Sequence, residues 1–250
     1  MLELNKIHRG DCLELMKGIP DGSVDMVLCD LPYGTTRNKW DTIIPLDELW
    51  EQYERVIKDN GAIVLTAQDK FTARLMMSRE KIHRYNLVWD KVLSSGFLNA
   101  NRMPLRSHED VLVFYKKLPT YNPQKTLGSP NHSKGMPKES NNNNYGDFGF
   151  LDNRETLGDL KHPKSIINIP KPHPSTTVHP TQKPVELFEW LIKTYTNEGE
   201  TVLDNCMGSG TTAIAALNTN RTFIGIEKEK EYVDKANERI KQSQLMFEMG

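Results

Sequence analysis

The feature that most constrains the fold of this chain is a segment near its end, TVLDNCMGSGTTAIAALNTNRTFIGIEKE, at residues 201–229. Residues 201–203 read as an apolar strand, residues 211–217 as a helix of small side chains, and residues 222–226 as a second strand. Two strands joined by a crossover helix run parallel. The segment therefore predicts an open parallel sheet that is covered by helices.

The turn inside this segment also predicts a ligand. Gly208, Gly210 and Ala213 fit the pattern GxGxxA, in which glycines let a ligand approach the backbone at the start of a helix. Glu227 ends the second strand 23 residues after Asp204, where a carboxylate can accept both hydroxyls of a ribose. This combination indicates a ligand that contains adenosine. The plainer alternative is a tight structural turn followed by a solvated acid.

The first half of the chain shows the same alternation of strands and helices. Strands are predicted at residues 25–29, 62–66, 87–92 and 111–115, and helices at residues 46–57 and 72–77, with Gly61 ending the first helix. Helical spacing returns after the irregular middle, with Pro184 as a first helical residue. The predicted fold class is α/β, with a doubly wound, mostly parallel, Rossmann-like sheet.

The middle of the chain interrupts this pattern. Between Leu118 and Val178 the periodicity disappears, and Pro, Asn, Gly, Ser and His dominate, including NNNN at residues 141–144. Such a segment is too long for an ordinary connection. Its composition predicts an exposed arm inserted into the domain.

The position of the glycine turn separates two classes of cofactor. Only the 23 residues from 228 to 250 follow Glu227, which is enough for one helix. A dinucleotide-binding fold opens with such a unit and needs further strands after it. The other strands must come from the N-terminal part, so we expect a circularly permuted sheet, with termini that lie close together. This order favours S-adenosylmethionine, and a nicotinamide-dependent oxidoreductase is the rival interpretation.

Charge and cysteine content narrow the function further. The chain has 32 basic and 33 acidic residues, but residues 70–117 hold ten Lys or Arg against four Asp or Glu. This local excess predicts a face for a polyanion, or else a solvated helix surface. Cys12, Cys29 and Cys206 are odd in number and lack CxxC spacing, so we expect reduced thiols and no metal site. Without a long apolar run, a soluble, cytoplasmic protein is expected.

Four short motifs occur in a fixed order along the chain. Gly10 and Asp11 come first, DLPY follows at residues 30–33, HPTQKP lies at residues 179–184, and LDNCMGSGTT lies at residues 203–212. In these motifs the chain resembles the S-adenosylmethionine-dependent DNA amino-methyltransferases of the β order, in which a DPPY-type catalytic motif precedes the cofactor motif. The resemblance spans nearly the whole chain except the Asn-rich arm. It departs from the family at Leu31, where proline is commoner.

The DLPY motif suits methyl transfer to an exocyclic amine, whose lone pair is delocalised into the ring of the base. The side chain of Asp30 and the carbonyl of Leu31 can accept hydrogen bonds from the two N–H groups and aim the lone pair at a methyl sulfonium. Pro32 confines Leu31 to extended conformations, and Tyr33 can stack on a base extruded from the duplex. Positioning then supplies most of the rate, without a strong general base. A polar strand end followed by a turn is the alternative.

The resemblance assigns other motif residues to the cofactor. It implies that Asp11 and Cys12 lie at the adenine and Glu227 at the ribose, while Thr181 and Lys183 approach the methionine carboxylate. The remaining cofactor residues that it implies are Asp204, Cys206, Met207, Gly208, Gly210 and Thr211.

A basic segment between two predicted strands supplies candidates for DNA binding. Lys91, Arg102 and Arg106 are suited to phosphate contacts, and Asn99 and Asn101 are suited to base edges. Ordinary solvation of a loop would explain the same residues.

The predicted protein is a DNA methyltransferase with a catalytic half at residues 1–117, a target-recognition arm at 118–178 and a cofactor-binding half at 179–250. Asp rather than Ser at position 30 favours adenine N6 as the target, with cytosine N4 as the alternative. A catalytically idle nucleic-acid-binding module is disfavoured, because every catalytic element is present. The expected partner is DNA in the cytoplasm, at the nucleoid, and the resemblance also admits a homodimer.

Overall fold

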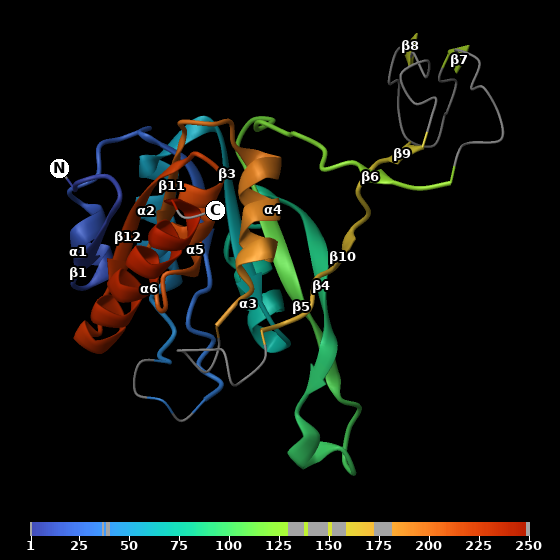
Figure 1. Ribbon diagram of the computed structural model, residues 1–250, viewed down its shortest axis with the longest axis horizontal. Helices are drawn as coiled ribbons and strands as arrows, with labels where there is room; N and C mark the ends of the chain where they lie inside the picture. The colour runs from blue at the N-terminus through green and yellow to red at the C-terminus, as the bar shows by residue number, and fades with distance from the viewer. Residues whose placement is uncertain are drawn as a thin grey trace. The chain divides into compact units, whose positions relative to one another are not determined.

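Eight strands form one sheet at the centre of the structure (Figure 1). The computed structural model describes residues 2–36, 38, 41–129, 138–139, 150–151, 159–172 and 182–248. In spatial order, the strands are β1 (Lys6–Arg9), β12 (Thr222–Glu227), β11 (Thr201–Asp204), β2 (Val24–Cys29), β3 (Ile57–Ala67), β5 (Arg106–Phe114), β4 (His83–Ser95) and β10 (Ile166–Asn168). Only β5 runs antiparallel to its neighbours.

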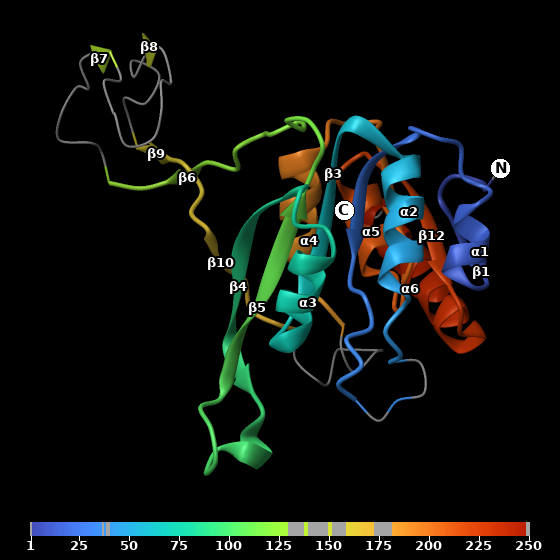
Figure 2. The ribbon, with the colours of Figure 1, turned by 180° about the vertical axis from the view of Figure 1, so that it is seen from behind.

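Helices cover both faces of this sheet, as Figures 1 and 2 show from opposite sides. They are α1 (Cys12–Met16), α2 (Leu46–Val56), α3 (Lys70–Ser78), α4 (Val185–Tyr195), α5 (Thr211–Asn218) and α6 (Lys230–Glu248), with a short 3-10 turn η1 (Phe97–Asn99). The predicted α/β class with a mostly parallel sheet is confirmed.

Strand β2 shows how the two helical layers are built from the sequence. Val27 and Cys29 pack with residues of α2 and α3, whereas Met26 and Leu28 pack with residues of α4 and α5. Successive residues of a strand point to opposite faces, so a strand covered on both sides must be apolar throughout. Accordingly, all six residues of β2 are buried.

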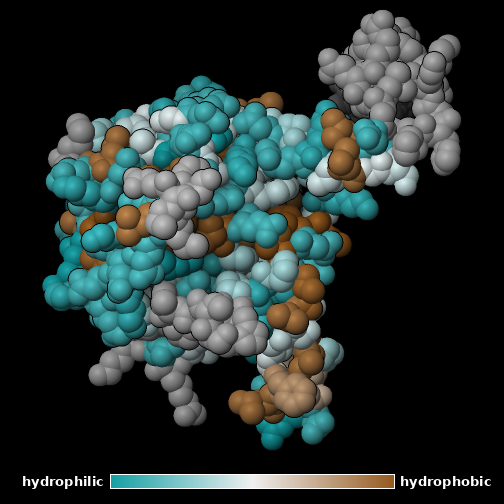
Figure 3. Space-filling view, in the orientation of Figure 1, coloured by the Kyte–Doolittle hydropathy of each residue, from teal (hydrophilic) through white to brown (hydrophobic). Residues whose placement is uncertain are grey.

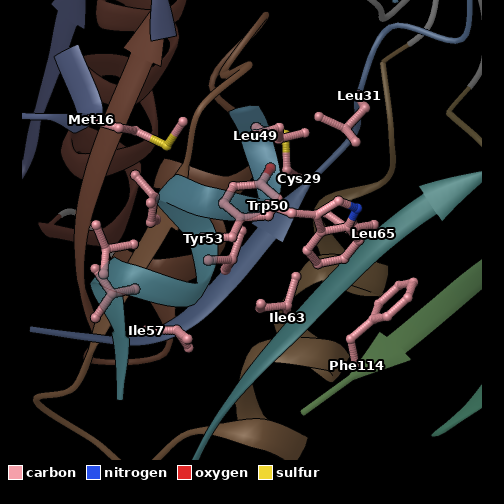
Figure 4. Close-up of a cluster of buried hydrophobic side chains, with 14 of the residues drawn as sticks. Met16, Cys29, Leu31, Leu49, Trp50, Tyr53, Ile57, Ile63, Leu65 and Phe114 are labelled. Atoms are coloured by element: carbon pink, nitrogen blue, oxygen red, sulfur yellow. The ribbon is translucent and has the colours of Figure 1, made fainter. Parts of the chain in front are cut away.

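Helix α2 packs against the sheet through one apolar stripe. Leu49, Trp50, Tyr53 and Val56 are buried, and their spacing places them on one face of the helix. Figure 4 shows Trp50 and Tyr53 projecting from α2 between the labelled residues of β2 and β3. The indole of Trp50 also donates a hydrogen bond of 2.7 Å to Ser78 Oγ, which links α2 to α3.

Two predicted element boundaries are wrong. The helix predicted to end at Gly61 ends at Val56, because Ile57 is already extended and begins β3. Gly61 lies inside β3, where an added Cβ would come within 2.7 Å of the carbonyl oxygen of Asp25. Glycine is therefore needed for close strand packing rather than for ending a helix. Pro184 likewise precedes the first helical residue of α4, Val185, instead of being that residue.

Strands β2 and β11 lie side by side, although they come from opposite ends of the chain. Met26 pairs with Val202 and Val27 pairs with Leu203, in parallel register. The carboxyl ends of both strands therefore meet at one edge of the sheet. In open α/β sheets, ligands bind at this edge where the strand order switches direction.

The chain divides into two compact units, residues 1–122 with 165–250, and residues 123–164. In the second unit, β6 (Thr126–Leu127) pairs with β9 (Leu160–Lys161), and β7 (Lys138–Glu139) pairs with β8 (Phe150–Leu151). The sequence NNNN at 141–144 lies outside the described residues. A recognition role for residues 118–178 stays a prediction. In the described part of the chain, no helix has the length and apolar character needed to cross a membrane.

A hydrogen bond from Tyr53 connects α2 to the carboxyl edge of the sheet, and its contribution to stability can be measured. Its side chain is fully buried, and its hydroxyl donates to Asn205 Oδ1, directly after β11. Tyr53→Phe should lower the free energy of unfolding by about 1–3 kcal/mol, because it leaves a buried amide oxygen without its donor. Urea unfolding measures this loss. Tyr121→Phe, at a half-exposed tyrosine, is the matched control, and an equal change in both variants would contradict the expectation.

Candidate active site

A cavity of about 1150 Å³ lies at the carboxyl edge of the sheet. Its lining includes residues from all four sequence motifs, among them Asp11, Asp30, Lys183 and Gly208. These residues are distant in the sequence, and the parallel register of β1, β12, β11 and β2 brings their elements to one edge. Among the described residues, the four predicted catalytic residues and all the predicted cofactor residues except Gly210 therefore line one space.

Asp30 follows the last residue of β2 and is held by three donors. Its Oδ1 accepts hydrogen bonds from the hydroxyl of Tyr33, at 2.8 Å, and from the hydroxyl of Thr66. Its Oδ2 accepts a bond of 2.6 Å from the ammonium of Lys183. A carboxylate offers about four acceptor positions. One position beyond these three can accept an N–H group from a ligand in the cavity.

Asp30 is one end of a chain of four alternating charges, in which the two lysines are buried and the two carboxylates are partly buried. Lys183 Nζ lies 3.3 Å from Glu109 Oε2 as well as 2.6 Å from Asp30 Oδ2, and Lys91 Nζ lies 3.2 Å from Glu109 Oε1. Burial alone would lower the pKa of Lys183, but Asp30 and Glu109 raise it above its ordinary value. Lys183 is therefore a cation, and the two lysines balance the two carboxylates.

This chain of charges changes two sequence-based interpretations and adds one residue to the site. Lys91 was predicted to contact phosphate, but its side chain is only 5% exposed and is engaged by Glu109, which argues against that contact. Lys183 was predicted to approach a methionine carboxylate, and the structure places it on Asp30. Glu109 was not predicted as a site residue. Its only signal in the sequence was a pair of acids, Glu109 and Asp110, directly before the strand predicted at residues 111–115.

Tyr33 is fixed in the site through both its hydroxyl and its ring. The hydroxyl lies 2.8 Å from Asp30 Oδ1 and 3.0 Å from Thr66 Oγ1. The ring stacks on Phe71 at a centroid distance of 5.2 Å, and Lys183 Nζ lies 5.7 Å from its centroid. Burial raises the pKa of Tyr33 well above its ordinary value, so its hydroxyl stays a donor. The structure thus adds an orienting contact to Asp30 that the sequence did not indicate.

Leu31, the departure from the commoner DPPY motif, has a structural use for its side chain. The residue is 3% exposed and belongs to the apolar cluster that contains α2 (Figure 4). Pro32 follows it and lines the cavity with Asp30 and Tyr33. Leu31 is thereby anchored in the core immediately beside the carboxylate.

The cofactor loop is held by carboxylates that accept backbone hydrogen bonds. Glu227 Oε2 accepts from the amide of Gly208, and Oε1 accepts from the amide of Glu229, both at 2.8 Å. Asp204 Oδ1 accepts from the amide of Cys206 at 2.9 Å, and Oδ2 accepts from the hydroxyl of Thr212. Both carboxylates also line the cavity, but Asp204 is only 2% exposed and its hydrogen bonds serve to shape the loop.

The two glycines of the loop have different requirements. Gly210 precedes α5 with a φ of +80°, and an added Cβ would lie 3.0 Å from the Cβ of Ala236 on α6. Gly208 has a φ of +50°, and the nearest atom to its added Cβ is 3.8 Å away. Gly210 is therefore needed for backbone conformation and helix packing. Gly208, which lines the cavity, is the glycine with space beside it.

Other predicted cofactor residues surround this loop. Asp11 caps α1 by accepting a bond of 3.0 Å from the amide of Leu13 and lies 3.7 Å from Lys228. Thr211 Oγ1 donates to the carbonyl of Lys183 at 3.3 Å, which ties the start of α5 to the segment before α4. Met207 is 3% exposed and lines the cavity. Thr181 lies outside the described residues.

The three cysteines, distant in the sequence, meet beside the cavity. Cys12 and Cys206 pack against the apolar cluster that contains Cys29, and all three thiols are free. The neighbouring thiol of Cys206 lowers the pKa of Cys12, while burial raises the pKa of Cys29 to about 12. Sequence spacing did not predict this cluster, because Cys12 follows β1, Cys29 ends β2 and Cys206 follows β11.

The predicted DNA-binding residues lie on the hairpin formed by β4 and β5. Asn99, Asn101 and Arg102 are on its exposed tip, and Arg106 begins β5. Arg106 Nη1 lies 3.4 Å from Gln68 Oε1 and 3.5 Å from Asp69 Oδ2. Of these four residues, only Arg106 lines the cavity.

Comparison with known proteins decides the family. A family model described as DNA methylase matches residues 24–238, which run from the start of β2 into α6. The chain belongs to this DNA methylase family. The match removes the rival interpretation of a nicotinamide-dependent oxidoreductase.

Relatives of this DNA methylase cover most of its length. It is 35% identical to the type II methyltransferase M.BglII of Bacillus subtilis, over 92% of this chain and 67% of that protein. It is 29% identical to the type II methyltransferase M1.MboII of Moraxella bovis, over 98% of this chain and 100% of that protein.

Two solved structures share the fold of this DNA methylase. The crystal structure of an M1.HpyAVI-SAM complex matches with a TM-score of 0.63 and 26% identity, covering 94% of this chain and 98% of that chain. The PvuII DNA methyltransferase, described as cytosine-N4-specific, matches with a TM-score of 0.65 and 17% identity, covering 95% of this chain and 90% of that one. The second likeness concerns the fold alone.

Asp204 gives the methylase loop a predicted dependence on pH. Burial raises the pKa of Asp204 from 3.8 to about 6. The folded state thus keeps a proton that the unfolded chain releases, and this stabilisation is fully present below pH 3.8 and is lost as the pH rises through 6. Between pH 4 and pH 7 the wild type should lose about 2 kcal/mol of unfolding free energy relative to Asp204→Asn, which cannot titrate.

Urea unfolding at several pH values measures this difference. Asp234→Asn, at an exposed acid of α6, is the matched control and should follow the wild type. Parallel pH profiles for the wild type and Asp204→Asn would contradict the assignment.

Proposed function

We propose that this DNA methylase transfers a methyl group from S-adenosylmethionine to the exocyclic amine of a base flipped out of DNA, and that the base is adenine, modified at N6. The observation that carries the proposal is the placement of Asp30. Its carboxylate directly follows β2 and lines the same cavity as Glu227, which ends β12, and Gly208, which lies beyond β11. An acceptor for an amine and a turn suited to adenosine thus share one space.

The residues around the cavity suit S-adenosylmethionine as the cofactor. Glu227 uses one position on each carboxylate oxygen for the loop amides, so further lone pairs can accept ribose hydroxyls. Asp11 lines the same region and is half exposed. When bound, S-adenosylmethionine supplies a methyl group on a sulfonium, whose leaving group is a neutral thioether. The M1.HpyAVI-SAM complex supports this choice of cofactor.

Asp30 positions the target amine in this proposal. One acceptor position of its carboxylate lies beyond those used by Tyr33, Thr66 and Lys183. The carbonyl of Leu31 accepts the second N–H, and the burial of its side chain holds the backbone beside Asp30 in place. The amine is then aimed by two acceptors that do not reorganise during the reaction.

Lys183 and Glu109 act as positioning residues for Asp30. Lys183 fixes one oxygen of the carboxylate from 2.6 Å, and Glu109 holds Lys183 from its other side. We assign Lys183 to this role instead of the methionine carboxylate. Because the pKa of Lys183 is raised by these two acids, it stays a cation and does not take a proton from the amine.

The choice of adenine rests on the acid at position 30. An Asp rather than a Ser at this place favours N6 of adenine in the family that the sequence resembles. Cytosine N4 is the second candidate, since the PvuII enzyme, which shares the fold, is described as cytosine-N4-specific. The order of the motifs, with Asp30 before the glycine turn, supports the β order and a circularly permuted sheet.

The remaining parts of the proposal concern DNA. Asn99 and Asn101 are assigned to base edges, and Arg102 and Arg106 to phosphates, on the β4–β5 hairpin. The segment at residues 118–178 is assigned to target recognition, between a catalytic half at 1–117 and a cofactor-binding half at 179–250. The protein would then act on DNA in the cytoplasm, at the nucleoid, as a monomer or a homodimer.

The decisive experiment expresses the chain in a bacterial host without DNA methylases of its own and then sequences the host DNA for modified bases. The expected result is N6-methyladenine within one short sequence. N4-methylcytosine would overturn the choice of base and keep the transfer reaction. Unmodified DNA from cells that contain the folded protein would overturn the proposed function.

Replacement of Asp30 separates positioning from cofactor binding. Asp30→Ala should lower methyl transfer by about 100-fold or more, because it removes an acceptor aimed at the reacting amine. Its affinity for S-adenosylmethionine should stay within a few fold, as measured by calorimetry. Asp59→Ala, at an exposed acid near the other end of β3, is the control. Near-normal turnover in Asp30→Ala would remove the carboxylate from the mechanism.

A further inference from the structure

The tip of the β4–β5 hairpin, residues 96–105, exposes large apolar side chains. Phe97 is 80% exposed, and Leu98 is fully exposed. The space-filling view shows brown side chains along this projection at the bottom of Figure 3. Other exposed apolar residues of the hairpin are Val92, Leu93, Met103 and Leu105. A contiguous exposed apolar patch of this kind marks an interaction site.

The topology of the sheet directs this tip toward the mouth of the cavity. Strand β5 is antiparallel to both β3 and β4, so β4 runs in the direction of β3. The turn after β4 therefore emerges at the carboxyl edge of the sheet, the edge at which Asp30 follows β2. The last β3 residue, Ala67, pairs with Asp110, and β5 begins four residues earlier at Arg106. At about 3.3 Å per residue, the hairpin already extends roughly 13 Å past β3 before its tip begins.

The hairpin is fixed at its base. The amide of Lys171 donates to the carbonyl of Lys91 at 3.1 Å, and its ammonium donates to the carbonyl of Ser94 at 3.2 Å. Val92 adopts a φ of +60°, which is unfavourable for a β-branched residue, and its amide is held by Asp90 Oδ1 at 2.9 Å. These contacts hold a bulge in β4, and bulges next to active sites re-aim the chain.

The charge of the hairpin favours DNA as its partner. Between Lys91 and Ser107 the sequence has three cations, Lys91, Arg102 and Arg106, and no acid. Lys91 is neutralised by Glu109, but Arg102 is on the exposed tip. An apolar tip flanked by Arg and Asn side chains and free of acids suits a polyanion with stacked apolar bases.

We propose that Phe97 and Leu98 form an apolar wedge that enters the base stack when the target base moves into the cavity. The inference rests on the proposed function, because a wedge is needed only if a base leaves the duplex. A flipped base leaves a gap beside its unstacked neighbours, and apolar side chains inserted between base steps are a known way to hold such a distortion. Ser95 and Arg106, which flank the tip of the hairpin, both line the cavity, so the wedge is connected directly to it.

The test compares paired and unpaired targets, using the recognition sequence found by sequencing the host DNA. One duplex carries the target base in its normal pair, and a second carries the same base opposite a mismatch. Phe97→Ser/Leu98→Ser should lower kcat/KM on the paired duplex by about 10-fold or more, and by less than about 3-fold on the mismatched duplex, whose base flips readily. Both positions are exposed, so the thermal midpoint of unfolding should match the wild type.

A second measurement reports the wedge without methyl transfer. 2-Aminopurine placed next to the target base should brighten when the wild type binds, because its stacking is interrupted, and should stay dim when the double variant binds. Met77→Ser is the matched control, since Met77 is 69% exposed and lies in the last turn of α3, outside the residues assigned to DNA or to the cofactor. It should behave as the wild type in both measurements.

Several outcomes would overturn the wedge while leaving the methylase function intact. Equal losses on the two duplexes would show a general contribution to DNA affinity. Unchanged turnover on the paired duplex would show that the tip is inert. A shift of the double variant to a smaller species in analytical ultracentrifugation would assign the tip to contact between copies of the chain. A wild type that methylates neither duplex would instead count against the proposed function.

Discussion

The pairing of β2 with β11 is the contact on which the rest of the site depends. Both strands are short, buried and apolar, and their parallel register aligns residues that are 176 positions apart, Met26 with Val202 and Val27 with Leu203. Asp25 reinforces the pairing, because its Oδ2 accepts a bond of 3.0 Å from the amide of Thr201. A slip of one residue would turn every side chain of β2 to the other face and would separate Asp30 from the cofactor loop.

The buried charges beside Asp30 show how a polar site is kept inside an apolar fold. Moving an isolated ion out of water costs several kcal/mol, and four ions lie together here. Each cation faces at least one carboxylate, so Lys91, Glu109, Lys183 and Asp30 form a neutral set. Such a set is sensitive to the loss of any member, since its neighbour is then left unpaired. The arrangement holds the carboxylate of Asp30 in a fixed orientation, and it makes all four positions intolerant of substitution.

Sequence patterns predicted the parts of the molecule that depend on local physics. Apolar runs located the buried strands, the glycine turn located the cofactor loop, and the carboxylate after β2 located the centre of the cavity. Patterns failed where the cause lay in distant residues. Gly61 is explained by the carbonyl of Asp25 on the adjacent strand, and the partnership of Lys183 with Asp30 spans 153 positions. The role of Glu109 and the cysteine cluster could not be predicted, because each depends on contacts between strands that are distant in the sequence.

The one antiparallel strand of the eight-stranded sheet, β5, has a consequence for how the protein can diversify. In an all-parallel sheet, every connection must cross from one edge to the other, so a change in its length disturbs the helix that covers the sheet. Reversal of β5 instead allows a direct turn between β4 and β5 at the carboxyl edge. Residues can be added to or removed from that turn without altering strand register or helix packing. Related enzymes can therefore vary the reach of this hairpin toward a long substrate while they inherit the same chemistry at its base.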